Sequence, residues 1–189
     1  MSVTSAMSIP TRRLAAIGDS IVFGSNPPSG NLKTSFATEM VRQSGGRLAA
    51  GASFNQGAGG ERLDQILARV AVLDTIPGLW GVIADGGVND LSQGASEQTV
   101  KDRMDALFAA IWSRGLVLCW LELLPGGATK AAINAHVRAV IAAAGGRNVS
   151  IDTSGVDVGA NTTDGTHFNE AGKVLGGGLG WAAAQTAGW

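Results

Sequence analysis

The sequence predicts an α/β fold with a parallel sheet, and three observations support this fold class. Apolar, β-rich runs occur at five places, near residues 13–18, 47–54, 79–85, 115–122 and 148–152. Segments with the apolar period of a helix lie between them, at residues 31–46, 61–76, 96–115 and 129–146. Glycine or proline stands where each helical segment stops. Because parallel neighbours in a sheet need helical crossovers, this alternation predicts parallel strands.

The helical segments carry start and stop signals. The first, third and fourth end in glycine, and Pro77 and Gly78 follow the second. Ser96 is a candidate N-cap for the third segment. This segment has an apolar stripe at Val100, Met104, Leu107, Phe108 and Ile111. The uncharged tail at residues 174–189 contains a triple glycine, yet we expect it to be a terminal helix packed closely on the core.

Composition bounds the organisation of the chain and its partners. The 189 residues suit one domain, which we expect to span residues 1–189 with residues 1–12 as a flexible N-terminal segment. A net charge of −1 gives no electrostatic reason to expect nucleic acid or an anionic membrane as a partner. No run is apolar for the roughly 18–20 residues of a membrane span. The N-terminus does not resemble a secretory signal, which leaves a cytoplasmic protein or one exported in a larger assembly.

Compact polar clusters follow four of the predicted strands. They are Gly18-Asp19-Ser20 and the segments at residues 54–62, 85–91 and 161–172. In open α/β sheets, ligands bind beyond the carboxyl ends of the strands. We therefore expect the four clusters to meet at one site.

Ser20 is a candidate nucleophile, although a serine after a strand is more often a turn or cap residue. It would need a base, because a free hydroxyl is weakly nucleophilic at neutral pH. Of the two histidines, His136 lies in the middle of a helical segment, whereas His167 lies in a loop three residues after Asp164. That spacing lets the carboxylate orient the imidazole, but a loop cap has the same pattern. A zinc site would lack further ligands.

Other polar residues have structural alternatives as well. A tetrahedral acyl intermediate needs hydrogen-bond donors, and the Gly60 N–H and the Asn89 amide could supply them. The segment around Asn89 also has the composition of an ordinary turn. We interpret Asp90 as a capping residue that supports this loop. The single cysteine, Cys119, lies in an apolar run and is expected to be buried and inert.

The segments "IGDS", "NQGAGG", "GVND" and "DGTH" resemble, in this order, the four sequence blocks of the SGNH (GDSL-type) hydrolases. The resemblance extends from residue 17 to residue 172. It implies that Ser20 is the nucleophile, His167 the base and Asp164 its partner. It also implies an oxyanion hole made of Ser20, Gly60 and Asn89. The implied fold is a flavodoxin-like, three-layer α/β/α sandwich with a five-stranded sheet in the order 2-1-3-4-5.

The chain departs from the family pattern at two positions. Ile21 stands where the family has leucine, and Val88 replaces the more usual threonine before Asn89. The glycine run also makes Gly57 an alternative to Gly60. We prefer Gly60, because the pattern Asn-x-Gly-x-x-Gly of the family places the donor last.

The resemblance, together with the short, polar loops after the strands, predicts an esterase without a metal or cofactor. Such loops leave little chain for a lid or a long acyl tunnel. We therefore expect a short acyl ester, most simply an acetyl group on a carbohydrate, as substrate. A lysophospholipase or thioesterase of the same family is the alternative. A binding module without catalysis and a flavodoxin-like FMN protein are further alternatives; the latter would need more hydroxyl groups after the first strand.

Overall fold

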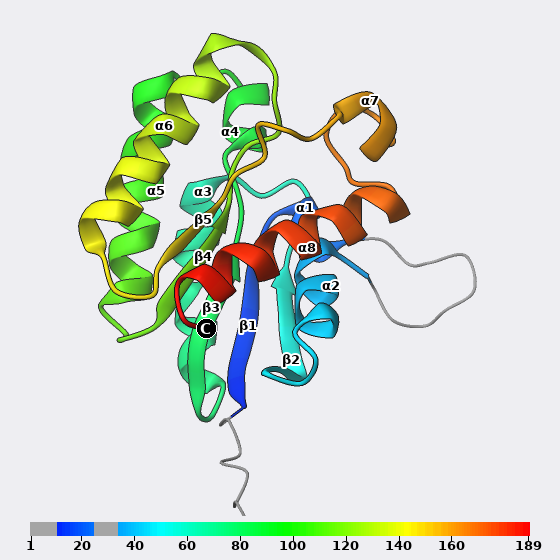
Figure 1. The fold of residues 1–189 in the computed structure, drawn as a ribbon. Helices are drawn as coiled ribbons and strands as arrows, with labels where there is room; N and C mark the ends of the chain where they lie inside the picture. The colour runs from blue at the N-terminus through cyan, green and yellow to red at the C-terminus, as the bar shows by residue number, and fades with distance from the viewer. Residues whose placement is uncertain (1–10, 25–33) are drawn as a thin grey trace, which may run out of the picture.

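The computed structural model of the chain describes residues 11–24 and 34–189 and contains a five-stranded parallel sheet (Figure 1). The order of the strands across the sheet is β2-β1-β3-β4-β5, which confirms the order that the resemblance implies. The predicted flexible segment at residues 1–12 lies outside the described residues except for its last two, of which Arg12 already belongs to β1. The strands are β1 (Arg12–Gly18), β2 (Leu48–Gly57), β3 (Leu79–Ala84), β4 (Val117–Leu121) and β5 (Val149–Ile151).

Helices cover both faces of the sheet, so the three-layer architecture is confirmed (Figure 1). Helices α3, α5 and α6 pack on one face, and α2 and α8 pack on the other. The helices are α1 (Ser20–Phe23), α2 (Phe36–Gln43), α3 (Leu63–Ala68), α4 (Val88–Ser92), α5 (Glu97–Trp112), α6 (Gly127–Ala144), α7 (Val158–Asn161) and α8 (Glu170–Thr186), with a 3-10 helix η1 at Val70–Thr75.

Strand β1 is buried on both faces, as expected for a central parallel strand. Ala15 and Ile17 contribute to the core under α5 and α6. Leu14 and Ala16 contribute to the core under α2 and α8. This alternation follows from the two-residue period of a strand.

Polar side chains begin several helices by capping their free N–H groups. The Ser96 side chain accepts the N–H of Thr99, which confirms the predicted cap of α5. Asn169 accepts the N–H of Gly172 in the same way and begins α8. Asn169 is two residues after His167, so this cap also fixes where the preceding loop ends.

Two predicted boundaries were wrong. The segment at residues 61–76 is not one helix: α3 ends at Ala68 and the chain continues as the 3-10 helix η1. The β-branched residues Val70 and Val72 lie just past this break, and such residues have low helix propensity. Strand β2 also runs three residues further than expected, through Gly57, because its last residues pair with the end of β1.

The C-terminal tail forms most of α8, as predicted, and its glycines allow α8 to lie close to α2. A Cβ atom on Gly177 would be 2.5 Å from the Glu39 Cβ and 2.7 Å from the Met40 backbone nitrogen. Gly176 and Gly180 likewise face side chains of α2, Phe36 and Met40. Within the described part of the chain, no helix has the length and apolar character needed to cross a membrane.

Candidate active site

Ser20 is the first residue of α1, immediately after the central strand β1. The preceding Asp19 caps this short helix, because its Oδ1 accepts the Ile21 N–H at 2.9 Å. The Ser20 Oγ lies 2.8 Å from the His167 Nε2. The structure thus joins two residues that are 147 positions apart in the sequence.

Asp164 orients His167 through two contacts. Its Oδ2 lies 2.6 Å from the His167 Nδ1, and its Oδ1 accepts the His167 backbone N–H at 2.8 Å. The N–H of His167 and then its ring lower the pKa of Asp164 to about 2. An ionised Asp164 favours the tautomer with hydrogen on Nδ1, which leaves Nε2 to accept the Ser20 hydroxyl hydrogen.

Asn89 lies in the first turn of α4, which follows β3, the neighbour of β1 in the sheet. Its Nδ2 donates to the Glu61 backbone oxygen at 2.9 Å and to the Asp19 Oδ2 at 3.3 Å. These contacts fix the orientation of the amide between the loop after β2 and the turn after β1. Asn89 is therefore linked to the Ser20 turn by its hydrogen bond to Asp19.

The two rival glycines of the second loop have different surroundings. Gly57 is in β2, its N–H donates to the Asn55 side chain, and a Cβ there would be 2.2 Å from the Phe23 nitrogen. Gly60 lies in the loop with a φ of 79°, a conformation that favours glycine. Its N–H, like that of Ser20, has no partner among the residues that the structure describes. Next to Gly60, a Cβ on Gly59 would be 4.0 Å from the Ser20 Cβ.

Two further residues of this region have roles that the sequence does not indicate. Asn55 donates from its Nδ2 to the backbone oxygens of Val22 and Phe23, and so attaches β2 to α1. Asp85 follows β3 directly, and its Oδ1 accepts the Asp19 N–H at 3.1 Å. Both residues lie in the polar clusters predicted after the strands. Their partners, however, follow β1, and only the folded sheet brings them together.

Asp90 supports this region in the capping role that the sequence predicts. Its Oδ2 accepts the Leu63 N–H at the start of α3, and its Oδ1 accepts a hydrogen bond from Arg103 of α5. The side chain is fully buried. Asp90 therefore joins α4 to two other helices.

His136 and Cys119 have the contacts of structural residues, not of catalytic ones. The His136 Nε2 on α6 lies 2.8 Å from the Asp105 Oδ1 on α5. Cys119 is buried in β4, and burial raises the pKa of its thiol. Among residues 11–24 and 34–189, no group of three or more His, Cys, Asp or Glu side chains is placed to hold a metal ion.

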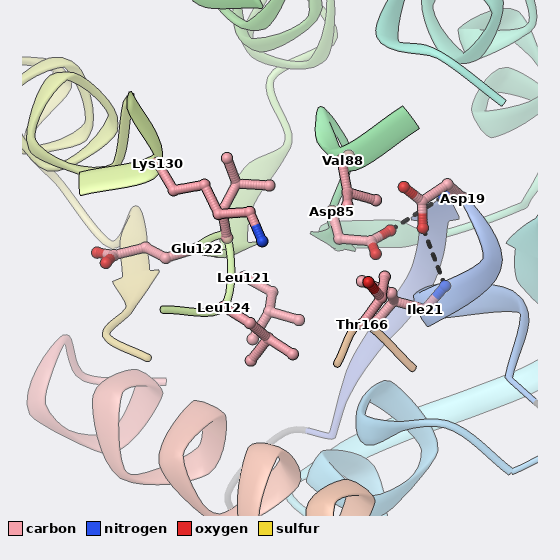
Figure 2. Close-up of a pocket in the computed structure, with 11 residues that line it drawn as sticks. Asp19, Ile21, Asp85, Val88, Leu121, Glu122, Leu124, Lys130 and Thr166 are labelled. Atoms are coloured by element: carbon pink, nitrogen blue, oxygen red, sulfur yellow. Dashed lines mark hydrogen bonds between the residues drawn. The ribbon is translucent and has the colours of Figure 1, made fainter. Parts of the chain in front are cut away.

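Two hollows adjoin the Ser20 turn. An open cleft of about 290 Å³ is lined by Ser20 and His167, together with Ile21, Gly24, Thr163, Phe168 and Lys173. A much narrower cavity of about 10 Å³ lies between the ends of β3 and β4 and shares Ile21 with the cleft. Figure 2 shows Asp19, Ile21 and Asp85 on one side of this cavity and Leu121, Leu124 and Lys130 on the other.

The arrangement contains the parts of nucleophilic catalysis at one edge of the sheet. A hydroxyl lies within hydrogen-bond distance of an imidazole, and a carboxylate orients that imidazole. The adjoining turns carry the Asn89 amide and the N–H groups of Ser20 and Gly60, which have no partner within the described part of the chain. This set of groups suits acyl transfer.

Comparison with known proteins gives one family match. The model of the GDSL-like lipase/acylhydrolase family matches residues 16–175. A search of curated proteins finds no significant match.

Solved structures share the fold at low sequence identity. A family 3 carbohydrate esterase of Clostridium thermocellum superposes with a TM-score of 0.70 at 20% identity, covering 94% of this chain and 96% of its own. A lipase/acylhydrolase from Enterococcus faecalis has the same TM-score and coverage at 18% identity. The lipase Lip_vut3 from a goat rumen metagenome also has a TM-score of 0.70, at 16% identity, covering 92% of this chain and 97% of its own.

Proposed function

We propose a mechanism and a substrate class for this chain, which belongs to the GDSL-like lipase/acylhydrolase family and is a carboxylic ester hydrolase. Ser20 is the nucleophile, His167 the general base and Asp164 the residue that orients it. The observation that carries this assignment is the line of contacts from the Ser20 Oγ through the imidazole to the Asp164 carboxylate, at 2.8 and 2.6 Å.

In the first half of the reaction, the Ser20 Oγ attacks the ester carbonyl carbon while its proton passes to the His167 Nε2. The carbonyl oxygen becomes an oxyanion, which accepts hydrogen bonds from the N–H groups of Ser20 and Gly60. It also accepts one from the Asn89 Nδ2, where it replaces the longer contact with the Asp19 Oδ2, at 3.3 Å. The imidazolium then gives its proton to the departing alcohol oxygen. The ester bond breaks, and the acyl group stays on Ser20.

In the second half, water replaces the alcohol. The water oxygen attacks the acyl carbon while His167 takes a proton from the water. The same oxyanion donors stabilise the second tetrahedral intermediate. The proton then returns to the Ser20 Oγ as the acid leaves. Asp164 stays ionised throughout, because its pKa of about 2 lies below any working pH.

The acyl group is short, most simply acetyl. The narrow cavity beside Ile21 has about 10 Å³ of free volume, which is about the room that one water-sized group needs. Ile21, Val88 and Leu124 give part of its wall an apolar surface that suits a methyl group. The rest of the wall includes the charged residues Asp19, Asp85, Glu122 and Lys130. A longer chain would leave methylenes in solvent, and each would forgo about 0.8 kcal/mol of binding.

The alcohol part is a carbohydrate and occupies the open cleft. About 290 Å³ accommodates a group much larger than the acyl part, and Thr163, Lys173 and the Phe168 ring line the cleft with polar and aromatic surface. The similarity to a carbohydrate esterase of the same fold supports this choice.

A series of p-nitrophenyl esters tests the acyl length. We expect kcat/KM to be highest at about two to four carbons and to fall with each further methylene, because the cavity cannot enclose it. A kcat/KM that rises steadily to long chains would contradict the proposal and favour a lysophospholipase or thioesterase. Release of acetate from acetylated xylo-oligosaccharides, measured beside p-nitrophenyl acetate and with Ser20→Ala as the blank, tests the carbohydrate part.

A further inference from the structure

Two buried carboxyl groups lie side by side behind the Ser20 turn. Asp19, after β1, and Asp85, after β3, have exposed fractions of 0% and 2%. Neither forms an ion pair with a lysine or arginine within residues 11–24 and 34–189.

Asp85 holds the backbone of the turn that carries Ser20. Its Oδ1 accepts the Asp19 N–H, as the dashed line between these residues marks in Figure 2. It packs so closely on Gly18 that a Cβ there would collide with the same oxygen. Asp19 in turn caps Ile21 with Oδ1 and accepts the Asn89 amide with Oδ2. The Asp85 side chain therefore fixes the turn of Ser20 directly and contributes to the orientation of Asn89 through Asp19.

The surroundings of the two carboxyl groups raise the pKa of both, but not to the same extent. Burial, and then the neighbouring charge of Asp19, raise the pKa of Asp85 well above its usual range. Burial also raises the pKa of Asp19, but the Ile21 N–H, the Asp85 side chain and the charge of His167 oppose this. Of the two carboxyl groups, Asp85 is therefore the one whose surroundings favour the neutral form more strongly.

The wall of the narrow cavity supplies an independent observation. The Asp85 Oδ2 is buried and has no hydrogen-bond partner in the described structure. An ionised oxygen without a partner would cost far more than the oxygen of a neutral carboxylic acid. Across the cavity lies Lys130, whose ammonium forms no ion pair with the carboxyl of Asp85. The other titratable neighbours are Glu122, which lines the cavity, and His167 and Asp90, which lie near Asp19.

We propose that Asp85 is a positioning residue that works as an uncharged carboxylic acid, on the premise of the roles proposed above for Ser20 and Asn89. It accepts the Asp19 N–H, keeps the Ser20 turn in place and adds no second negative charge beside the oxyanion. The rival arrangement is an ionised Asp85 balanced by Lys130.

Two substitutions separate these arrangements. Asp85→Asn keeps the acceptor oxygen and is neutral at every pH, so we expect kcat for p-nitrophenyl acetate to stay within about threefold of the wild type. Asp85→Leu has a similar volume but cannot accept the Asp19 N–H. We expect it to lower kcat more than about tenfold with little change in KM, because the oxyanion donors act mainly in the transition state.

The stability of the folded state reports the charge independently of activity. A carboxylic acid that is neutral when folded and ionised when unfolded binds its proton only in the folded state. Between the unfolded pKa and the higher folded pKa, it therefore makes unfolding easier as the pH rises, by up to about tenfold in the equilibrium constant per pH unit. We expect the wild type to lose stability from pH 5 to pH 7 relative to Asp85→Asn. Asp90→Asn is the matched control, since it breaks a buried ion pair with Arg103 and should lower Tm at both pH values.

Either of two results would overturn the proposal. One is an Asp85→Asn variant as inactive as Asp85→Leu, or an Asp85→Leu variant as active as the wild type. The other is the same change of stability with pH in the wild type and in Asp85→Asn, which would mean that Asp85 is ionised. If Ser20→Ala instead retained activity, the proposed function would fail, while the stability comparison would still decide the charge of Asp85.

Discussion

The contact between α8 and α2 gives the sharpest prediction about packing, at Gly177. A Cβ at this position would lie 2.5 Å from the Glu39 Cβ and 2.7 Å from the Met40 nitrogen. Because ordinary contact of a Cβ begins near 3.4 Å, Gly177→Ala requires the helices to separate by about 1 Å. Such overpacking costs about 1–3 kcal/mol, while alanine regains about 1 kcal/mol of helix propensity. We expect a net loss of up to about 2 kcal/mol in the free energy of unfolding.

The next residue supplies the matched control. A Cβ on Gly178 would meet only the end of the flexible Gln43 side chain, at 3.1 Å. Gly178→Ala should therefore gain up to about 1 kcal/mol from helix propensity alone. For a domain of this size, 1 kcal/mol changes Tm by about 2–4 °C. Thermal unfolding followed by circular dichroism should show Tm falling for Gly177→Ala and rising for Gly178→Ala. A rise of Tm in both variants would refute the close packing of α8 on α2.

The remaining predictions concern the catalytic groups. His167→Ala should be nearly inactive toward p-nitrophenyl acetate and His136→Ala nearly unchanged; the reverse result would exclude His167 as the base. Asp164→Ala should retain more activity than His167→Ala, because the base remains and only its orientation is lost. Activity should fall at acid pH along one ionisation, since the low pKa of Asp164, about 2, keeps this carboxylate charged over the measurable range; a second ionisation in the profile would argue otherwise. Asn89→Ala should lower kcat by about 100- to 1000-fold with little change in KM, whereas an effect on KM alone would mean that Asn89 binds only the ground state.

Much of the fold could be predicted because its signals are local. Apolar runs, glycine stops and a cap at Ser96 lie within single segments, and the alternation of strands and helices is visible along the chain. The strand order came from the family resemblance. The extension of β2 through Gly57 could not be predicted, because it depends on pairing with β1. The break after Ala68 has only a weak local signal, the β-branched residues Val70 and Val72 that follow it.

Some residues of the candidate site could be predicted from local signals, whereas others depend on contacts between distant segments. The sequence blocks marked Ser20, Asn89 and His167, whose residue types and loop positions are visible in the sequence. Asp85 opens one of the polar clusters, but the sequence does not distinguish it, because its role depends on the adjacency of β1 and β3 and on its burial beside Asp19. A carboxyl group after a strand is common. Asp85 becomes unusual only because a second buried carboxyl group, that of Asp19, lies next to it and neither has an ion pair in the described structure.

The most direct test of the catalytic assignment is covalent labelling of the nucleophile. A fluorophosphonate probe should add one label per chain, which peptide mass spectrometry should locate on Ser20, and esterase activity should fall in proportion to the label. Ser20→Ala should take up no label and lose roughly four to six orders of magnitude in kcat while keeping the Tm of the wild type within a few degrees. A label on another residue, or hydrolysis retained by Ser20→Ala, would contradict the account.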